Sequence, residues 1–444
     1  MVRQECTVEN GHCVTGNGDC MTGNGKCAMI NSDGLALVSP IDVSDMPSEA
    51  VGIDGVWYDV TQFKKIHPGG PIIDQYIGKD ASTVFRAFNH DPAFLKRVKQ
   101  VGRYKMAQHA CDADFEKLRQ YFTERGFFET DYVWYVMKAF VAMSWFIAGV
   151  TAVLAFDNFY IHMLGAVLIA FFFQQSGFIM HDCMHKTMTR QRIKDQFIGT
   201  FFGTVGFGMS SHWWHDEHII HHIVTNAIDV TTKFVDPQMW ELSWAQNEKL
   251  FPLFSGIFQY LCIKIQHITF VPFVVAIGRY EILTDSYRVE RRWYEWIAIV
   301  LHWTWMIALL SQLPSWRERA IFYVILACVE GLFHFQLILS HYCKAFITMD
   351  EFHQVSWNAF QVLSNMNLHT YKFMDWYYGG LNFHIEHHLY PKMARKHLRT
   401  AGPYVKAVCE KHGIDYEMLS FVDALKKTLS HMKRVGAAYK YQSG

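Results

Sequence analysis

The sequence predicts a small α+β domain followed by an all-α membrane domain, whose four transmembrane helices form two hairpins beneath a histidine-rich cytosolic cap. Composition is the first reason: the 444-residue chain is 51% hydrophobic and only 18% charged, which is apolar for a soluble protein. The second reason is distribution, because segments long enough to cross a bilayer occur only after residue 130. The 41 basic and 41 acidic residues balance, so the charge gives no indication of a nucleic-acid partner.

Residues 1–47 are expected to form a disordered tail. Cysteines recur there every seven residues, at Cys6, Cys13, Cys20 and Cys27, within a Gly/Asn-rich repeat that has no apolar positions to bury. A tandem repeat explains this spacing better than a zinc site, because the gaps between the cysteines are wide for zinc. The other six cysteines are scattered, which fits a reducing compartment. The tail has no apolar segment, so no cleaved signal peptide is expected.

Residues 48–105 have the composition and patterning of a small soluble domain. The stretch GVWYDVTQF alternates apolar and polar residues as a half-buried strand does, and turns and short helical patterns follow it. His67 stands in the turn sequence HPGG, and His90 follows 23 positions later. Two neutral imidazoles that face each other across a flat cofactor form a good axial pair for a haem iron.

The segments YDVTQFKKIHPGG and GKDASTVFRAFNH resemble those of a cytochrome b5 domain. The resemblance implies that His67 and His90 bind haem b. One departure is Asn89, which precedes His90 at the place where the family's second histidine often directly follows the phenylalanine.

The membrane domain is expected to cover residues 131–435, after a polar linker at 106–130. Its predicted spans are each about 20 residues long, enough to cross a bilayer, and lie at 133–155, 159–180, 293–311 and 320–341. Four spans return both ends of the domain to the same side of the membrane. Two other apolar segments, 197–209 and 251–277, are interrupted by Gly, Pro or Lys and are predicted to be interfacial or partly embedded.

Loop charges bear on the orientation of these spans. The loop at 181–292 holds eleven lysines and arginines and the turn between the first two spans holds none, which favours a cytosolic loop. Arg317 and Arg319 oppose this orientation, because they lie in a turn that it places on the far side.

Histidines gather in three places, all at or after the same-side end of a span. His181 and His185 have the helical spacing i, i+4, and each of the other two groups has the spacing i, i+3, i+4, so each group can present its imidazoles on one helix face. These other groups are His218, His221 and His222, and then His384, His387 and His388. Eight imidazoles are too many for one metal ion, and a sulfur-free nitrogen set permits iron, zinc or copper. The expected haem domain favours iron, because iron that activates O₂ needs electrons delivered to it.

The motifs HDCMH, HIIHH and HIEHH, with GFGMSSHWW and WYYGGLNF nearby, resemble the three histidine boxes of the membrane fatty-acid desaturase superfamily. Together with the N-terminal domain they resemble a front-end desaturase over about residues 50–430. The resemblance implies that the eight histidines bind two Fe ions and that His341, in LILSHYCK, is a further ligand. His384 stands where the front-end branch usually has glutamine, which leaves the subfamily and the double-bond position open.

Three further histidines have two interpretations each, and two carboxylates have one expected role. His334 lies roughly on the same helix face as His341, and both a ligand and a packing role are open to it. His212 and His215 either orient the ligands or lie at the surface, and Asp182 and Glu386 are expected to accept the free N–H of ligating imidazoles.

The resemblance implies an oxygen-dependent di-iron enzyme that inserts a cis double bond between an existing double bond and the carboxyl end of a polyunsaturated fatty-acyl chain. The implied substrate is a fatty-acyl lipid or acyl-CoA, and NADH-cytochrome b5 reductase is the expected electron donor through the haem. The protein is expected in the endoplasmic reticulum membrane, with the haem domain and histidine boxes facing the cytosol.

Three alternatives stay open at this point: a sphingolipid long-chain-base desaturase, a lipid hydroxylase of the same superfamily, and a membrane-anchored electron carrier with an inactive second half. The electron carrier predicts gaps in the histidine boxes, and the sequence has none.

Overall fold

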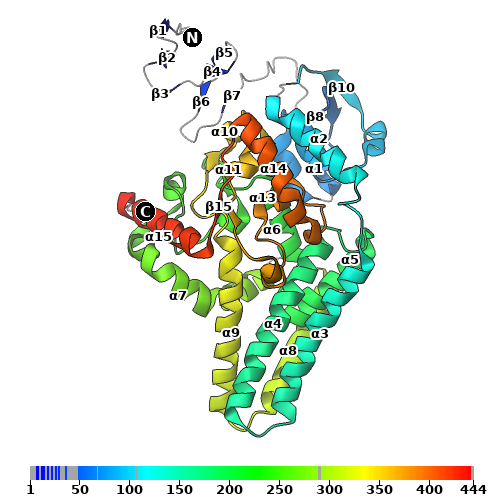
Figure 1. Cartoon of the computed structure of the whole chain (residues 1–444), viewed down its shortest axis with the longest axis vertical. Helices are drawn as coiled ribbons and strands as arrows, with labels where there is room; N and C mark the ends of the chain where they lie inside the picture. Colours follow the sequence, from blue (N-terminus) through cyan, green and yellow to red (C-terminus); the bar gives the residue numbers. More distant parts are fainter. Residues whose placement is uncertain are drawn as a thin grey trace.

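The computed structural model describes residues 49–441 apart from 68, 107–108 and 289–291 (Figure 1). Before residue 49 it describes only seven short strands, β1–β7, at Thr7–Glu9, His12–Thr15, Gly18–Asp19, Thr22–Gly23, Lys26–Cys27, Met29–Ile30 and Ala36–Leu37. The remainder of the expected disordered tail lies outside the described residues, so its disorder stays a prediction.

The N-terminal domain is α+β. Its antiparallel sheet has the strand order β10-β9-β8. Asp54 and Gly55 join β8 to β9 in a tight turn with φ angles of 51° and 80°, and such left-handed residues are typical of two-residue hairpin loops. The elements of the domain are β8 (Ala50–Ile53), β9 (Val56–Asp59), η1 (Phe63–Ile66), η2 (Gly70–Tyr76), α1 (Ser82–Ala87), η3 (Pro92–Arg97) and β10 (Gln100–Arg103).

The expected linker contains helix α2 (Ala110–Glu124), which joins the N-terminal domain to the cap. Its buried side chains, such as Phe115 and Phe122, recur at helical spacing and face the cap. One hydrophobic core contains Val51 of the N-terminal domain, Phe115 of α2 and Ile385 of the cap. The two domains therefore pack together as one body.

Five described helices are long and apolar enough to cross a membrane, judged by length and composition. Four of them match the predicted spans, and the fifth, α7, contains most of one of the two segments predicted to be interfacial, 251–277. In Figure 1, α3, α4, α8 and α9 run together away from the cap, whereas α7 lies near the cap end of α9. The four-span topology remains a prediction. The five helices are α3 (Tyr132–Leu154), α4 (Phe159–Met184), α7 (Gly256–Arg288), α8 (Trp293–Ser311) and α9 (Trp316–Ile338).

Glycines permit two close helix contacts in this bundle. A Cβ atom at Gly165 of α4 would lie 3.1 Å from the carbonyl oxygen of Gly149 of α3. A Cβ atom at Gly331 of α9 would overlap the carbonyl oxygen of Val275 of α7. Small residues at such crossings let helix backbones approach closely within a membrane.

The cap consists of short elements that connect and cover the cap-side helix ends. A small sheet with the order β12-β11-β13 contains a parallel pairing of β11 with β13, which joins the segment after α6 to the segment after α9. The cap elements are α5 (Arg192–Gly199), the π-helix η4 (Thr200–Phe207), α6 (Ser211–Ile223), β11 (Ala227–Asp229), β12 (Phe234–Val235), η5 (Pro237–Met239), η6 (Glu248–Leu253), β13 (Ile347–Thr348), α10 (Met349–Phe352), α11 (Trp357–Leu363), β14 (Asn367–Leu368), η7 (Lys372–Met374), α12 (Asp375–Tyr378), α13 (His384–Leu389), η8 (Arg395–His397), α14 (Leu398–His412), β15 (Met418–Leu419) and α15 (Phe421–Ala438).

Candidate functional site

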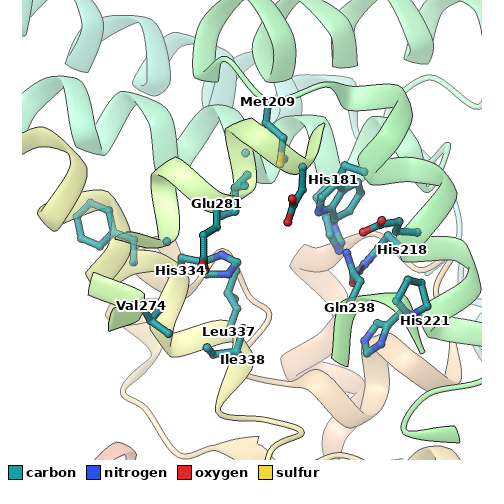
Figure 2. A pocket seen from close by; sticks show the side chains of 18 of the residues that line it. His181, Met209, His218, His221, Gln238, Val274, Glu281, His334, Leu337 and Ile338 are labelled. Atoms are coloured by element: carbon teal, nitrogen blue, oxygen red, sulfur yellow. Dashed lines mark hydrogen bonds between the residues drawn. The ribbon is translucent and has the colours of Figure 1, made fainter. Parts of the chain in front are cut away.

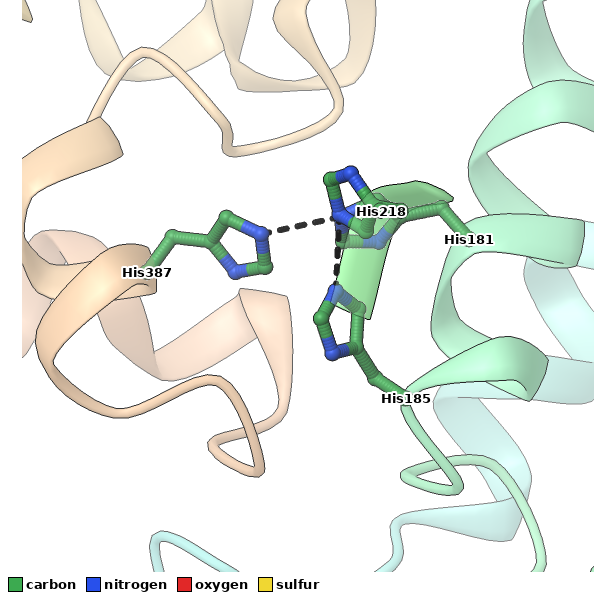
Figure 3. A group of neighbouring side chains, drawn as sticks. All are labelled: His181, His185, His218 and His387. Carbon is green, nitrogen blue, oxygen red and sulfur yellow. Dashed lines mark hydrogen bonds between the residues drawn. The ribbon is translucent and has the colours of Figure 1, made fainter. Parts of the chain in front are cut away.

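The fold brings together histidines from α4, α6, α13 and the turn after α9. Seven of them form two groups, and within each group the candidate ligand atoms lie within 4.8 Å of one another. Figure 3 shows the first group, in which His387 from α13 approaches the histidines of α4 and α6. The first group is His181, His185, His218 and His387, and the second is His221, His341 and His388.

The two remaining predicted ligands lie beside these groups. The Nε2 atom of His222 lies 3.0 Å from Nε2 of His218, and its ring stacks on His388 with the centroids 4.1 Å apart. The Nε2 atom of His384 lies 2.9 Å from Nε2 of His341. All nine histidines predicted from the sequence therefore lie in one buried region.

Local structure fixes the direction in which α6 presents its imidazoles. The Ser210 hydroxyl caps the helix by accepting from the backbone N–H of Trp213 at 3.2 Å. The same hydroxyl donates to the buried Glu295 carboxylate at 2.6 Å, and the Ser211 hydroxyl donates to it at 2.7 Å. The start of α6 is thereby tied to the start of α8.

Several Nδ1 atoms are held by acceptors outside the groups. His218 donates to the Gln238 side chain at 2.7 Å, and His221 donates to the Asp236 carboxylate at 2.8 Å. His388 lies 3.0 Å from the Gln361 amide oxygen. An imidazole that donates from Nδ1 has its lone pair on Nε2, so these contacts set the tautomer that leaves Nε2 free for a metal.

The Nε2 atoms then face one another across short distances. Those of His181 and His387 are 3.0 Å apart, and so are those of His185 and His218. Burial lowers the pKa of His218, His222, His387 and His388 well below the ordinary value, so these imidazoles are neutral. Converging lone pairs in a buried, neutral nitrogen set are satisfied by cations, so the residues present fit a pair of metal ions.

Of the two carboxylates expected to orient ligands, only Asp182 contacts one. Its Oδ1 atom lies 3.2 Å from Nδ1 of His181, and Arg395 donates to the same oxygen at 2.5 Å. The expectation for Glu386 is wrong: its carboxylate accepts from the Tyr416 hydroxyl at 2.7 Å and from the Asn367 amide at 2.8 Å. Glu386 therefore fixes the position of α13 against the C-terminal segment.

The other predicted histidines lie outside both groups. His212 lies 3.7 Å from the carboxylate of Asp216, and His215 lies 2.9 Å from it. Among the described residues, neither histidine therefore orients an imidazole of the two groups. His334 lines the cavity described below, about two helical turns before His341.

In the N-terminal domain, the rings of His67 and His90 are parallel within 8° and their centroids are 6.5 Å apart. Each Nδ1 atom contacts a backbone carbonyl, that of Gly70 at 3.2 Å for His67 and that of Phe85 at 3.0 Å for His90. Burial is the main cause that lowers the pKa of both imidazoles. Two neutral, parallel rings with Nε2 free fit the axial ligands of a haem.

A cavity of about 510 Å³ adjoins the histidine groups (Figure 2). Its walls come from α4, α6, α7, α9 and the segment after β12, and four of its lining histidines belong to the groups: His181, His218, His221 and His341. Apolar side chains such as Phe173, Val274 and Leu337 form much of the remaining wall. A long apolar ligand in this cavity would lie directly beside the nitrogen atoms.

Comparison with known proteins agrees with this geometry. The model of the fatty acid desaturase family matches residues 157–420, which contain every histidine of the two groups. The chain belongs to the fatty acid desaturase family. In front of this match, the model of the cytochrome b5-like heme/steroid binding domain matches residues 49–122 of the desaturase.

Relatives of the desaturase share this arrangement over most of their length. It is 30% identical to Delta(8)-fatty-acid desaturase 2 of Arabidopsis thaliana over 411 residues, which are 86% of this chain and 89% of the relative. It is 29% identical to a Delta(8)-fatty-acid desaturase of Helianthus annuus, covering 86% and 87% of the two chains. It is 28% identical to the Delta(6)-fatty-acid desaturase fat-3 of Caenorhabditis elegans, covering 86% and 95%.

The family and the geometry together confirm the predicted chemistry. The desaturase is a membrane oxidoreductase that acts on a fatty-acyl chain with O₂, and its cofactors are haem and a di-iron centre. Sequence reasoning missed the acceptors Asp236, Gln238 and Gln361, which hold Nδ1 atoms of the ligand set. The only sequence feature that pointed to these three acceptors was their polarity. The fold buries or half-buries all three next to histidines.

Proposed function

We propose that the desaturase is a front-end acyl desaturase, which inserts a cis double bond between an existing double bond and the carboxyl end of a polyunsaturated fatty-acyl chain. The observation that carries the proposal is the apolar cavity that opens onto both histidine groups. The fused cytochrome b5-like domain and the Delta(8) and Delta(6) names of the relatives support the front-end position.

The proposed iron ligands are the nine clustered histidines. One ion is assigned to the first group and the other to the second group with His384, while His222 lies between the groups and is close to both. Bound iron supplies the redox chemistry with O₂ that breaks unactivated C–H bonds. The protein positions the acyl chain against the apolar part of the cavity wall, since such a chain offers no charge near the reacting carbons.

Electrons are proposed to reach the site through haem b bound by His67 and His90, with NADH-cytochrome b5 reductase as the donor. The packing of the two domains supports transfer within one chain. Tyr76 of the N-terminal domain packs edge-on against His353 of the cap with ring centroids 5.3 Å apart, within the core that both domains share.

The same proposal places four spans in the endoplasmic reticulum membrane, with the haem domain at 48–105 and the cap of the membrane domain, 131–435, on the cytosolic side. The eleven basic residues in the 181–292 loop support this orientation. Shared packing supports it further, because the haem domain must lie on the same side as the cap that it contacts.

Lipid analysis of yeast that expresses the full chain tests this function. Cells are fed a panel of polyunsaturated fatty acids, and fatty acids and sphingoid bases are analysed in parallel by gas chromatography and mass spectrometry. The expected product carries a new double bond between an existing one and the carboxyl end. Unsaturation found only in sphingoid bases, or hydroxylated products, would overturn the front-end proposal.

Two histidine variants separate the metal site from general effects on folding. His387→Ala should abolish the product while the protein still inserts into membranes, because it removes a ligand of the first group. His212→Ala is the matched control, since among the described residues its imidazole lies beside Asp216 and His215 and not beside the clustered histidines. Equal product from His387→Ala and the unmodified chain would contradict the ligand assignment.

A further inference from the structure

A second pocket lies where the first predicted span meets the cap, apart from the cavity that adjoins the histidine groups. Its volume is about 300 Å³, and its walls come from α3, η7, α12, η8 and α14. The pocket and the cavity have no lining residue in common. A ligand in this pocket would therefore occupy a site separate from the cavity.

The pocket carries excess positive charge. Five lysines and arginines line it. Three of them, Arg395, Lys396 and Arg399, each pair with an aspartate at 2.5 Å. Within the described part of the chain, no carboxylate oxygen lies within 4 Å of the other two, Lys138 and Lys372. Two uncompensated ammonium groups match the charge of a doubly ionised phosphate monoester.

Lys138 has an unusual position for a lysine. It is the only charged residue of the predicted span 133–155. Helix α3 begins at Tyr132, so Lys138 lies about 9 Å along the helix axis from this start. Its ammonium group lies 5.1 Å from the centroid of the Trp134 ring. A lysine within a span is costly unless its side chain reaches the membrane surface or meets an opposite charge there. Lys138 therefore indicates an anionic ligand at the level of the lipid head groups.

Aromatic side chains place the pocket beside lipid. Trp376, in the pocket wall, packs against Trp145 of α3 with ring centroids 6.5 Å apart and against Phe171 of α4 with centroids 5.9 Å apart. Tyr371 and Phe373 beside it are 73% and 70% exposed. Tryptophan and tyrosine are enriched where membrane helices enter the head-group region. These contacts favour a membrane lipid over a soluble partner as the occupant.

One wall of the pocket is held in place by the protein itself. Arg395 is only 4% exposed and donates to the backbone carbonyls of Gly379 and Phe178. Its Nε atom also donates to the Asp182 carboxylate at 2.5 Å. A wall that is already ordered costs little to keep ordered when a ligand binds, which favours affinity.

We propose that this pocket binds the phosphate head group of an anionic membrane phospholipid, with Lys138 and Lys372 as the ammonium groups that contact the phosphate. Basic pockets beside membrane helices are suited to such head groups. Phosphatidic acid is the simplest lipid of this class, because its head group is a phosphate monoester. In phosphatidylcholine a quaternary ammonium offsets the phosphate, so this lipid gains less from the two lysines. The inference goes beyond the proposed function and does not depend on it.

Affinity is measured first, by isothermal titration calorimetry of the purified full-length protein in a neutral detergent. The probes are dihexanoyl phosphatidic acid, dihexanoyl phosphatidylcholine and inorganic phosphate. Phosphatidic acid should bind about tenfold or more tightly than phosphatidylcholine, and its affinity should fall as the salt concentration rises. Equal binding of the two lipids would overturn the proposal. Inorganic phosphate that binds as tightly as phosphatidic acid would identify free phosphate as the ligand and overturn the assignment to a lipid.

Variants connect the affinity to the two lysines. Lys138→Gln and Lys372→Gln should each weaken binding of phosphatidic acid severalfold, and about tenfold together, without weakening phosphatidylcholine. The double variant Lys426→Gln/Lys433→Gln is the matched control, because it removes the same charge from exposed positions on α15. Haem absorbance and melting temperature verify folding, and the single variants serve if the double variant does not fold. Unchanged affinity for phosphatidic acid in folded variants would exclude this pocket.

Lipids that stay bound during purification test the same pocket in the membrane. The full chain is expressed in yeast and purified in mild detergent, and the bound lipids are compared with total membrane lipids by mass spectrometry. Anionic phospholipids should be enriched, and less so in Lys138→Gln/Lys372→Gln than in the control variant. Equal enrichment in the two variants would contradict the proposal. Neither measurement requires turnover, so a chain that yields no desaturated product would overturn the proposed function and leave this inference standing.

Discussion

Asp236 provides a sharp test of how the second histidine group is held. Its carboxylate is fully buried and accepts three hydrogen bonds: from His221 Nδ1 at 2.8 Å, from the Asn226 backbone N–H at 2.9 Å and from the Gln238 backbone N–H at 3.1 Å. His221 and Asn226 share one oxygen, and Gln238 uses the other. In Asp236→Asn, an amide NH₂ group must face at least one of these donors.

The variant therefore loses at least one hydrogen bond to a charged acceptor, at a cost of about 1.5–3 kcal/mol. Loss of a partner that orients a ligating imidazole typically weakens metal binding about tenfold to hundredfold, which corresponds to about 1.4–2.7 kcal/mol. The two estimates agree, and we expect a decrease in Fe(II) affinity of this size with little change in haem content.

Competition with a chromogenic Fe(II) chelator measures the affinity on purified protein. Asp229→Asn is the matched control, because the Asp229 carboxylate accepts from the turn at Thr231 and Thr232 and contacts no histidine of the described residues. Unchanged iron affinity in folded Asp236→Asn protein would refute the argument that this carboxylate positions His221.

Three further predictions follow from other parts of the structure. His67→Ala should remove the haem absorbance and stop electron delivery within the chain, and added free cytochrome b5 should partly restore product; retained absorbance would contradict the haem assignment. Burial lowers the pKa of His353 to about 4, so the folded protein favours the neutral imidazole. The contribution of His353 to the free energy of unfolding is therefore complete above the unfolded pKa of about 6.5, and it is lost as the pH falls towards 4. Melting temperatures should therefore fall less steeply over that pH range in His353→Gln, and identical slopes would count against the prediction. Gly331→Ala should lower stability by about 1–3 kcal/mol, because its Cβ would meet the backbone of α7, whereas Gly177→Ala, whose Cβ meets nothing within 4 Å, should melt normally.

Much of the candidate site was predictable because its spacing is local. The intervals between His218, His221 and His222 place them on one face of α6 without any knowledge of the tertiary fold. Their meeting with His181 and His387 was also predictable, because all three groups follow same-side ends of predicted spans. The residue ranges of α3, α4, α8 and α9 were predictable from the length of the apolar segments alone.

The contacts that hold the imidazoles could not be predicted in this way. Gln361 lies 27 residues before the His388 that it holds, and Asp236 lies 15 residues after His221. These pairs depend on how the cap segments fold over the helix ends. Glu386 was assigned wrongly for the same reason, since Tyr416 and Asn367 reach it through the pairing of β14 with β15.

Helix α7 shows a different limit of sequence patterns. Its apolar stretch is interrupted by Lys264 and Pro272, which favoured an interfacial segment, yet residues Gly256–Arg288 form one continuous helix. The close contact between Gly331 and Val275 holds this helix against α9, and that contact has no sequence signal on α7 itself. Its packing also places Glu281 and Asp285 in the cavity wall.

The most direct test of the account is a count of non-haem iron in the purified full-length desaturase. Total metal is measured by inductively coupled plasma mass spectrometry, and haem iron is subtracted after a pyridine haemochromogen assay. The two histidine groups predict close to two non-haem irons for each chain and one haem. A non-haem count near zero in protein that desaturates lipid, or zinc in place of iron, would contradict the di-iron site.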